Sequence, residues 1–122
     1  MSQSKKTMDR FYYLSSCDTC KRILKTLELP DSIERVDIKK HPLREEELAD
    51  LFAHTQSYEA LLNKRAQKLK AIDSSILTEE KIKELLLSHY TFLKRPVLVY
   101  KGQLFIGNAK ATIEAAKVAV HG

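Results

Sequence analysis

An unbroken aromatic and apolar run opens the patterned part of the chain. Residues 11–14 read Phe-Tyr-Tyr-Leu, and such a run is typical of a buried β-strand. From Cys17 onward the apolar residues fall on one face at helical spacing, and Pro30 ends this pattern because proline cannot continue a helix. Apolar residues within 33–38 then indicate a second strand. Strand, helix and strand in this order are typical of a parallel crossover unit.

Helical patterns fill the middle third of the chain. Glu45–Glu47 precede an apolar stripe, and a helix is expected here because negative charge is favoured in the first turn. Residues 58–63 predict a further short helix, and the polar, basic stretch over 63–70 predicts a solvated loop. Thr78 is expected to cap another helix, which ends near His89.

The last third returns to β-rich sequence. Two short runs, Val97–Tyr100 and Gln103–Ile106, flank a turn that contains Gly102, and this arrangement predicts a β-hairpin. An alanine-rich helix is expected after the hairpin, with Asn108 as its N-cap. The order βαβ, helices, ββα predicts an α/β fold of the thioredoxin-like kind. It has a four-stranded mixed sheet and a helical insertion, at about 43–90, between the two halves.

Composition narrows the class of protein. The chain has 122 residues, of which 43% are hydrophobic and 30% charged. This is enough for one compact domain over 1–122, and it is unlike a disordered or collagen-like chain. Residues 1–9 are expected to form a loose N-terminus. No apolar run approaches the roughly 20 residues of a membrane span, and no signal-peptide pattern is present, so a cytoplasmic protein without membrane contact is expected.

The net charge is +5. A positive balance fits small oxyanions, nucleic acid or an acidic protein surface, and it also fits simple solubility, so it does not choose among these. The basic stretch with Lys64, Arg65, Lys68 and Lys70 has no aromatic residues between the cations. Direct contact with nucleic acid is therefore not expected.

The most informative motif is the pair Cys17 and Cys20, which are the only cysteines of the chain. They stand where the first predicted strand passes into the first predicted helix. Cys17 would lie at the helix N-terminus, where the helix dipole and unpaired N–H groups favour a thiolate. Cys20 falls on the apolar face of the same helix. We predict that Cys17 is the attacking thiol and that Cys20 is the resolving thiol, at a spacing that permits a disulfide.

Other interpretations of the cysteine pair stay open at this stage. Cys20 would also serve as a small core residue. A separate interpretation is that both thiols are inert. Half of a zinc site is a further interpretation. The four histidines show no paired ligand spacing, so no metal is expected.

Arg95 and Pro96 form the second candidate feature. A proline that enters a strand is unusual because it removes a hydrogen-bond donor from the sheet. In a thioredoxin-like sheet this proline would face the reactive thiol, and Arg95 would neutralise an oxyanion or pair with the thiolate. The alternative is an edge-strand proline beside a solvated arginine.

Several segments together resemble the arsenate reductase and Spx family of thioredoxin-like proteins, over roughly residues 10–120. The matching segments are Phe11–Tyr13, Ser16–Arg22, Glu59–Lys64, Leu93–Val97 and Ile106–Gly107. The resemblance implies the four-stranded thioredoxin-like sheet, the helical insertion, and a cis peptide bond before Pro96.

The arsenate reductases of this family use one cysteine as the nucleophile, and it matches Cys17. The resemblance implies a thiol–arsenate adduct that glutathione and glutaredoxin resolve, with glutathione as a co-substrate and no bound cofactor. Three arginines hold the oxyanion in those enzymes. Arg95 matches one of them, and a second position falls at Asn63, with Lys64 and Arg65 just beyond. We therefore expect an arsenate-reductase-like thiol oxidoreductase that acts on a small oxyanion or thiol substrate. The match of only one of the three arginines, Arg95, argues against arsenate itself as the substrate.

The third arginine position falls near Gly107 and Asn108, with Lys110 as the nearest cation. Arsenate reductases of this type usually have serine at the position of Cys20. The Cys-x-x-Cys motif resembles instead the Spx branch, whose members are redox-switched regulators that bind RNA polymerase. The alternative function is therefore an Spx-like regulator whose Cys17–Cys20 disulfide changes its affinity for a protein partner such as RNA polymerase. A third hypothesis is an interaction protein whose thiols are incidental.

Overall fold

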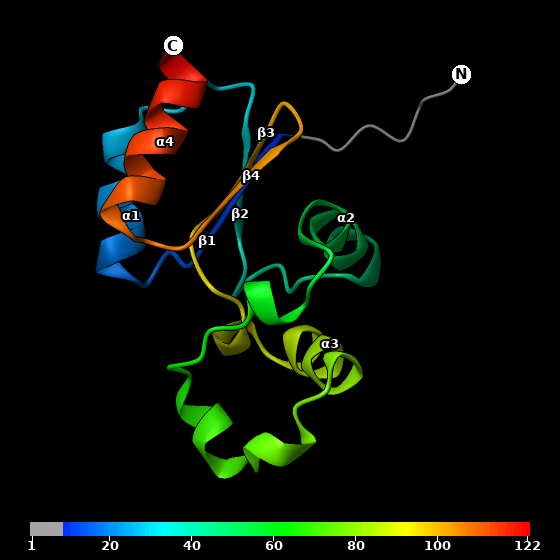
Figure 1. Cartoon of the computed structure of the whole chain (residues 1–122). Coiled ribbons are helices and arrows are strands. Elements are labelled where there is room, and N and C mark those ends of the chain that lie inside the picture. Colours follow the sequence, from blue (N-terminus) through cyan, green and yellow to red (C-terminus); the bar gives the residue numbers. More distant parts are fainter. Residues whose placement is uncertain (1–8) are drawn as a thin grey trace.

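A four-stranded mixed sheet forms the centre of the molecule (Figure 1), in a computed structural model that describes residues 9–122. The strands are β1 (Arg10–Tyr13), β2 (Glu34–Asp37), β3 (Val97–Tyr100) and β4 (Gln103–Ile106). Their spatial order is β2-β1-β3-β4, with β1 and β2 parallel and the other two pairs antiparallel. The predicted strands, the crossover unit and the hairpin are confirmed. The expected loose N-terminus, 1–9, lies outside the described residues except for Asp9.

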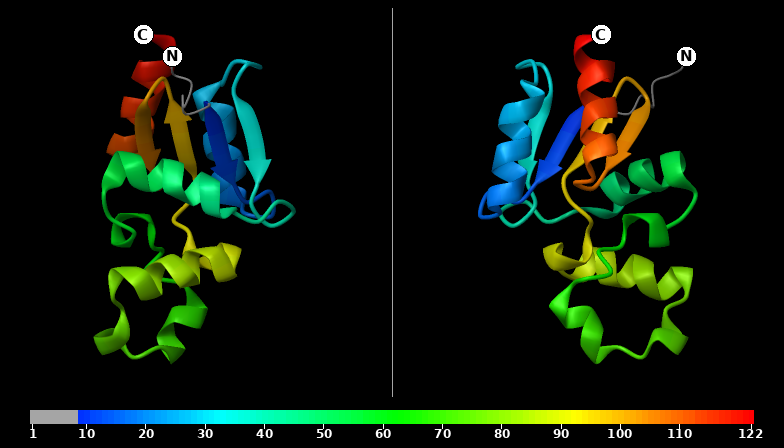
Figure 2. Two further views of the ribbon diagram at one scale, coloured as in Figure 1. Left: turned by 90° about the vertical axis from the view of Figure 1, so that its right-hand side faces the viewer. Right: turned by 60° about the vertical axis from the view of Figure 1, so that its left-hand side comes forward.

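Helices cover both faces of this sheet. On one face lie α1 (Asp18–Leu27) and α4 (Lys110–His121), and on the other lies α2 (Glu45–Thr55), as Figures 1 and 2 show. Side chains alternate between the faces with the period of two that strands impose. Phe11 and Leu98 pack with α1 and α4, whereas Tyr12 packs into the second cluster with α2. The sheet is therefore buried on both sides, which explains the unbroken apolar run of β1.

The segment between β2 and β3 adds a lobe below the sheet (Figure 2). After α2 it contains α3 (Glu79–Ser88) and four short 3-10 helices. These are η1 (Glu59–Leu61), η2 (Gln67–Ala71), η3 (Ser74–Ile76) and η4 (Tyr90–Phe92). The helix expected at 58–63 is present as η1. No helix among residues 9–122 is long and apolar enough to cross a membrane.

The basic stretch over 63–70 is more ordered than the solvated loop predicted for it, since η2 covers its second half. Ala66, Leu69 and Ile72 stand three residues apart. This spacing matches the three residues per turn of a 3-10 helix and puts all three on one side. Ala66 is buried, and the other two pack against the same core. The cations interrupt the longer helical period, which is why the sequence pattern failed to predict this element.

Two expected helix caps have different outcomes. The Thr78 hydroxyl accepts a hydrogen bond from the Lys81 N–H, at 3.2 Å, so Thr78 is the N-cap of α3 as predicted. The prediction for Asn108 is wrong, because the N-cap of α4 is Ala109, which has no side-chain cap. Gly107 turns the chain at φ +91 and donates its N–H to the Pro96 carbonyl, so the helix begins one residue later than expected.

Candidate active site

Cys17 stands at the N-cap of α1, directly after the end of β1. Its backbone N–H donates to the Leu14 carbonyl at 2.9 Å, and its own carbonyl accepts from the Lys21 N–H at 3.1 Å. The half-buried thiol therefore lies beside the first, unpaired N–H groups of the helix. This is the position that the sequence predicted.

The turn that leads into Cys17 is anchored to the end of β2. The carboxylate of Asp37 accepts from the Ser15 hydroxyl and from the backbone N–H groups of Ser15 and Lys39. Burial alone would raise the pKa of Asp37, but these hydrogen bonds outweigh burial and hold its pKa below the usual value. The ionised carboxylate thus fixes the approach to the reactive cysteine.

The pKa of the Cys17 thiol is lowered. Burial pushes the pKa upward, and four groups together outweigh it: the Cys20 backbone N–H, the Cys20 thiol, the Thr19 backbone N–H and the Arg95 guanidinium. The Cys17 side chain closes no capping hydrogen bond. The helix N–H groups act instead by favouring the anion, so a larger fraction of Cys17 is thiolate at neutral pH than for an ordinary cysteine.

Cys20 has the opposite character. It is 1% exposed and lies in the core beneath Cys17, and both cysteines are free thiols. Burial, together with the neighbouring Cys17, raises the pKa of Cys20 to about 11. Cys20 therefore stays protonated at neutral pH, and its S–H donates to the Cys17 thiolate.

Arg95 and Pro96 directly precede β3, and the charge of the Arg95 guanidinium acts on both thiols. The peptide bond between them is cis, as the family resemblance implies. The Arg95 Nη1 donates to the Leu93 carbonyl at 3.3 Å, while the buried Nε has no hydrogen-bond partner among residues 9–122. The positive charge of Arg95 is one of the groups that lower the pKa of Cys17.

A short antiparallel pairing between residues 61–63 and 92–94 brings further cations close to Arg95. Leu62 and Leu93 form an isolated β-bridge. The Asn63 N–H donates to the Phe92 carbonyl at 2.7 Å, and the Lys94 N–H donates to the Leu61 carbonyl at 2.8 Å. This pairing puts residues 63–65 beside residues 94 and 95, although about 30 positions separate them in the sequence.

These elements surround an open cleft of about 410 Å³. Its lining residues are Cys17, Thr19, Cys20, Asn63, Lys64, Arg65, Lys94, Arg95, Ile106, Gly107, Asn108 and Ala109. Four of them are cations and none is a carboxylate. The N-termini of α1 and α4 also lie at the cleft, because Cys17, Thr19 and Ala109 line it. Figure 1 shows both helices starting at the end nearest the lower lobe. The cleft therefore combines a thiolate with an environment that favours anions.

A model of the ArsC family matches residues 12–116 of the chain. The chain belongs to the ArsC family. No curated protein matches its sequence. The family supports a thiol oxidoreductase kind of function, and the four-stranded sheet with its helices is the thioredoxin-like fold of this family.

Solved structures show the same fold. An arsenate reductase (ArsC) related protein from Brucella melitensis is 27% identical, with a TM-score of 0.68 over 93% of this chain and 97% of that one. A protein from Staphylococcus aureus is 28% identical, with a TM-score of 0.70 over 88% of this chain and 97% of that one. An arsenate reductase from Vibrio cholerae is 19% identical, with a TM-score of 0.69 over 94% and 99% of the two chains. At that identity the likeness concerns the fold alone.

Of the residues predicted from the sequence to form the site, all except Pro96 line this cleft. Cys17, Cys20, Lys64, Arg65 and Arg95 all line the cleft, and Asn63 lines it too. The Asn63 amide is already engaged, since it donates to the Thr91 carbonyl at 3.2 Å and accepts from the Arg65 N–H at 3.1 Å. Pro96 is buried behind the lining, and its carbonyl holds Gly107.

Lys94 and Thr19 line the cleft but were not predicted as site residues. Lys94 lies within the segment Leu93–Val97 that resembles the family, and its place next to Arg95 could have marked it as a site residue. Thr19 was overlooked because its contribution comes from the helix backbone next to Cys17. Among residues 9–122, no three His, Cys, Asp or Glu side chains are grouped so that they could hold a metal ion.

Proposed function

We propose that this chain is a thiol oxidoreductase in which Cys17 attacks an oxidised substrate and Cys20 resolves the product. The observation that supports the proposal is the opposite behaviour of two neighbouring thiols. The pKa of Cys17 is lowered at a helix N-terminus over a cationic cleft, while burial raises the pKa of Cys20 to about 11. One thiol is thus prepared to attack and the other is kept protonated until it is needed.

The reaction can be written so that atoms and electrons balance for an oxyanion substrate. The Cys17 thiolate attacks the central atom, and a hydroxyl group of the oxyanion takes up a proton and leaves as water. The Cys20 sulfur then attacks Cys17, its proton passing to the departing oxyanion or to water. The electron pair of the bond between Cys17 and the central atom stays with that atom, which leaves reduced by two electrons. The protein keeps a Cys17–Cys20 disulfide.

Arg95 would act on the charge that develops in this step. Its guanidinium already favours the Cys17 thiolate, and its buried Nε is without a hydrogen-bond partner among the described residues. An anionic substrate oxygen in the cleft would give this guanidinium a charged acceptor, because charged donors bind oxyanions strongly. Lys64, Arg65 and Lys94 would supply the positive charge that the second and third arginines supply in arsenate reductases.

Glutathione or glutaredoxin is the proposed source of electrons. A thiolate of either reductant would attack the disulfide, release one cysteine, and leave a mixed disulfide that a second thiol clears. Glutathione carries two carboxylates, which suits a cleft lined by four cations and no acidic residue. A small oxyanion and a small oxidised thiol are the two substrate classes that this cleft would accept.

The first test is intact mass after mild peroxide, followed by a glutathione titration, with free thiols alkylated before analysis. The expected result is a loss of about two mass units with both cysteines blocked, and recovery of both thiols with glutathione. Turnover of an oxidised substrate with a thiol reductant should then disappear in Cys17→Ser and fall in Cys20→Ser. If both thiols of the wild-type protein stay free and react slowly with the alkylating reagent, the proposed function is wrong.

Cys20 also favours a second candidate function, an Spx-like regulator whose disulfide changes its affinity for a protein partner. A buried second cysteine fits such a switch as well as it fits a resolving thiol. The two functions differ in the behaviour of the protein after oxidation. A reductase regenerates its thiols during steady turnover, whereas a regulator forms the disulfide, shows little turnover, and binds a partner such as RNA polymerase differently in its two redox states.

A further inference from the structure

The positive charge of this chain is concentrated around the cleft. The four segments that line and border it, residues 17–22, 63–70, 94–95 and 106–110, contain nine of the 21 lysines and arginines but only one of the 16 acidic residues. The other segments together carry more acidic than basic residues. The net charge of +5 therefore comes from these four segments rather than from the rest of the chain.

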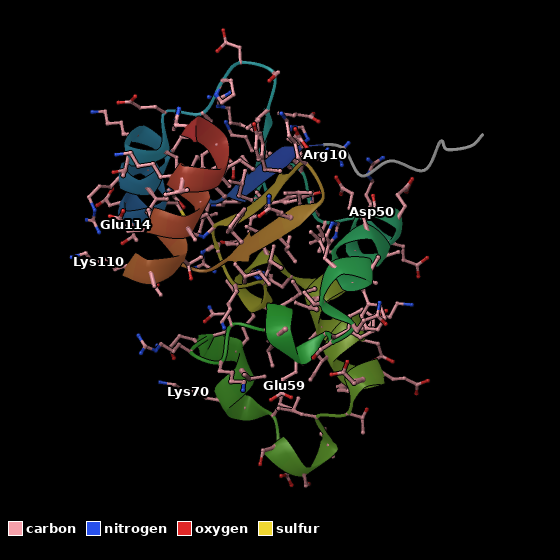
Figure 3. All side chains as sticks on the ribbon, turned by 45° about the horizontal axis from the view of Figure 1, so that its top comes forward. Arg10, Asp50, Glu59, Lys70, Lys110 and Glu114 are labelled. Atoms are coloured by element: carbon pink, nitrogen blue, oxygen red, sulfur yellow. The ribbon has the colours of Figure 1, made fainter. Side chains whose placement is uncertain are left out.

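Much of this charge lies outside the space that a small substrate would occupy. Arg22, Lys68, Lys70 and Lys110, here called the basic collar, are exposed and do not line the cleft. Figure 3 shows Lys70 and Lys110 extending on the same side of the molecule, from η2 and from the start of α4, while Asp50 on α2 lies on the opposite side. The four collar residues thus stand on three separate elements, α1, η2 and α4.

The acidic residues near the collar do not neutralise it. Asp18 lies 3.8 Å from the Lys21 ammonium, and Glu59 lies 2.9 Å from the Lys64 ammonium. Glu114 stands one turn beyond Lys110 on α4. Within residues 9–122, none of the four collar cations forms an ion pair. A surface of unpaired like charges around a reactive group steers a partner of opposite charge toward that group.

We propose that the basic collar is the docking surface for an acidic protein that presents a cysteine thiol to the cleft. This inference rests on the proposed function, because the partner acts on the Cys17–Cys20 disulfide. The partner thiolate attacks the Cys17 sulfur, forms an intermolecular disulfide, and displaces Cys20, which takes up a proton. A second thiol of the partner then attacks the partner's own sulfur and releases the Cys17 thiolate. The partner leaves as a disulfide, two electrons poorer.

An acidic protein suits the collar better than nucleic acid does. The four segments contain no Phe, Tyr or Trp on which a base could stack. The collar residues also belong to the segments that line and border a cleft with a pair of thiols, which a nucleic acid has no group to reduce. A small reductant would need only the cleft cations, so the outer charges are explained by a partner larger than the cleft.

The test uses the full chain with its disulfide formed and three dithiol peptides. Each peptide carries Cys-Gly-Gly-Cys between two pairs of Glu, Ser or Lys residues. Every rate of disulfide reduction is divided by the rate of the same peptide with bis(2-hydroxyethyl) disulfide, because acidic flanks also lower the reactivity of the thiol. At low salt the Glu peptide should react on the order of tenfold faster than the Ser peptide, and the Lys peptide slower. Half-molar salt should remove the difference.

Matched variants localise the effect. Lys68→Glu combined with Lys110→Glu should remove the preference for the Glu peptide and leave reduction by dithiothreitol unchanged. Lys101→Glu is the control, since Lys101 is exposed at the opposite end of the β3–β4 hairpin from the cleft, and it should keep the preference. Equal normalised rates for the three peptides, or the same loss in the Lys101 variant, would overturn the collar proposal.

Binding separates this proposal from the proposed function. Versions of the peptides with both cysteines replaced by serine should bind the reduced protein in the order Glu, Ser, Lys, measured by fluorescence anisotropy. This order is expected even if no Cys17–Cys20 disulfide can be formed, in which case only the proposed function fails. If a single-stranded 20-nucleotide DNA binds at 150 mM salt more tightly than the Glu peptide, the collar is a nucleic-acid surface and the docking proposal is wrong.

Discussion

Replacing Cys20 tests how the two thiols depend on each other. In the folded protein the protonated Cys20 thiol donates to the Cys17 thiolate and is one of the groups that lower the pKa of Cys17. Cys20→Ala removes this donor without adding a charge. The variant is therefore expected to raise the pKa of Cys17 and to slow its reaction with electrophiles near neutral pH.

The size of the effect can be worked out from the strength of the lost hydrogen bond. A hydrogen bond to a charged group contributes about 1.5 to 3 kcal/mol, and a thiol is a weak donor, so the lower end applies. About 1.4 kcal/mol corresponds to one pKa unit, so the pKa of Cys17 should rise by about one unit. The backbone N–H groups of Thr19 and Cys20 and the charge of Arg95 are kept, so the pKa should not rise much further.

The assay is the rate of alkylation of Cys17 by iodoacetamide between pH 4 and pH 10, followed by intact mass. Cys20→Ser is the matched control, because its hydroxyl keeps a donor at the same place while removing the second sulfur. We expect the serine variant to titrate within about half a unit of the wild-type protein and the alanine variant about one unit higher. If Cys17 titrates at the same pH in all three proteins, the hydrogen bond from Cys20 does not hold the pKa of Cys17 down, and the argument fails.

Three further predictions concern stability. Burial raises the pKa of Cys20 from 9.0 to about 11, so Cys20 ionises at lower pH in the unfolded chain than in the folded protein. The free energy of unfolding of the wild-type protein should therefore fall by up to about 3 kcal/mol between pH 9 and pH 11. Urea titrations of Cys20→Ala should not show this fall. Equal losses would contradict this. Burial would raise the pKa of Asp37, but hydrogen bonds lower it below 3.8. Asp37→Asn should therefore be less stable than the wild-type protein at pH 7, and this difference in stability should shrink as the pH falls below 3.8. A difference that stays constant with pH in thermal melts would refute the linkage. Leu98 is 2% exposed, so Leu98→Ala should lower the free energy of unfolding by about 2 to 5 kcal/mol at an unchanged m-value, and a loss below 1 kcal/mol would show that the sheet face repacks.

Most of the fold could be predicted because its elements have clear periods. The run of β1 is buried on both faces and so is continuously apolar, and α1 shows its buried stripe of Cys20, Ile23 and Leu27 at helical spacing. The start of α4 was misplaced by one residue, because the positive φ of Gly107 and its hydrogen bond to Pro96 decide it. Long-range contacts of that kind leave little trace in a local pattern.

The candidate site was predictable to a different extent. Cys17 could be placed from local sequence alone, since the strand-to-helix junction puts it at a helix N-terminus. The place of Arg65 and Lys94 in the same cleft depends on the bridge between Leu62 and Leu93, which joins residues far apart in the chain. Neither residue carries a local signal of that pairing. A resemblance to known proteins can align such positions, but only the structure shows that they meet.

The antiparallel pairing between residues 61–63 and 92–94 closes the chain between them into a loop, with the pairing at its base. Two cations that line the cleft, Lys64 and Lys94, stand at the two ends of this loop, whereas η3 lies at its far tip. Loop-closure entropy changes by only about 0.6 kcal/mol when a loop doubles in length. The tip can therefore gain, lose or exchange residues during evolution at little thermodynamic expense, while the chemistry at the base is inherited intact.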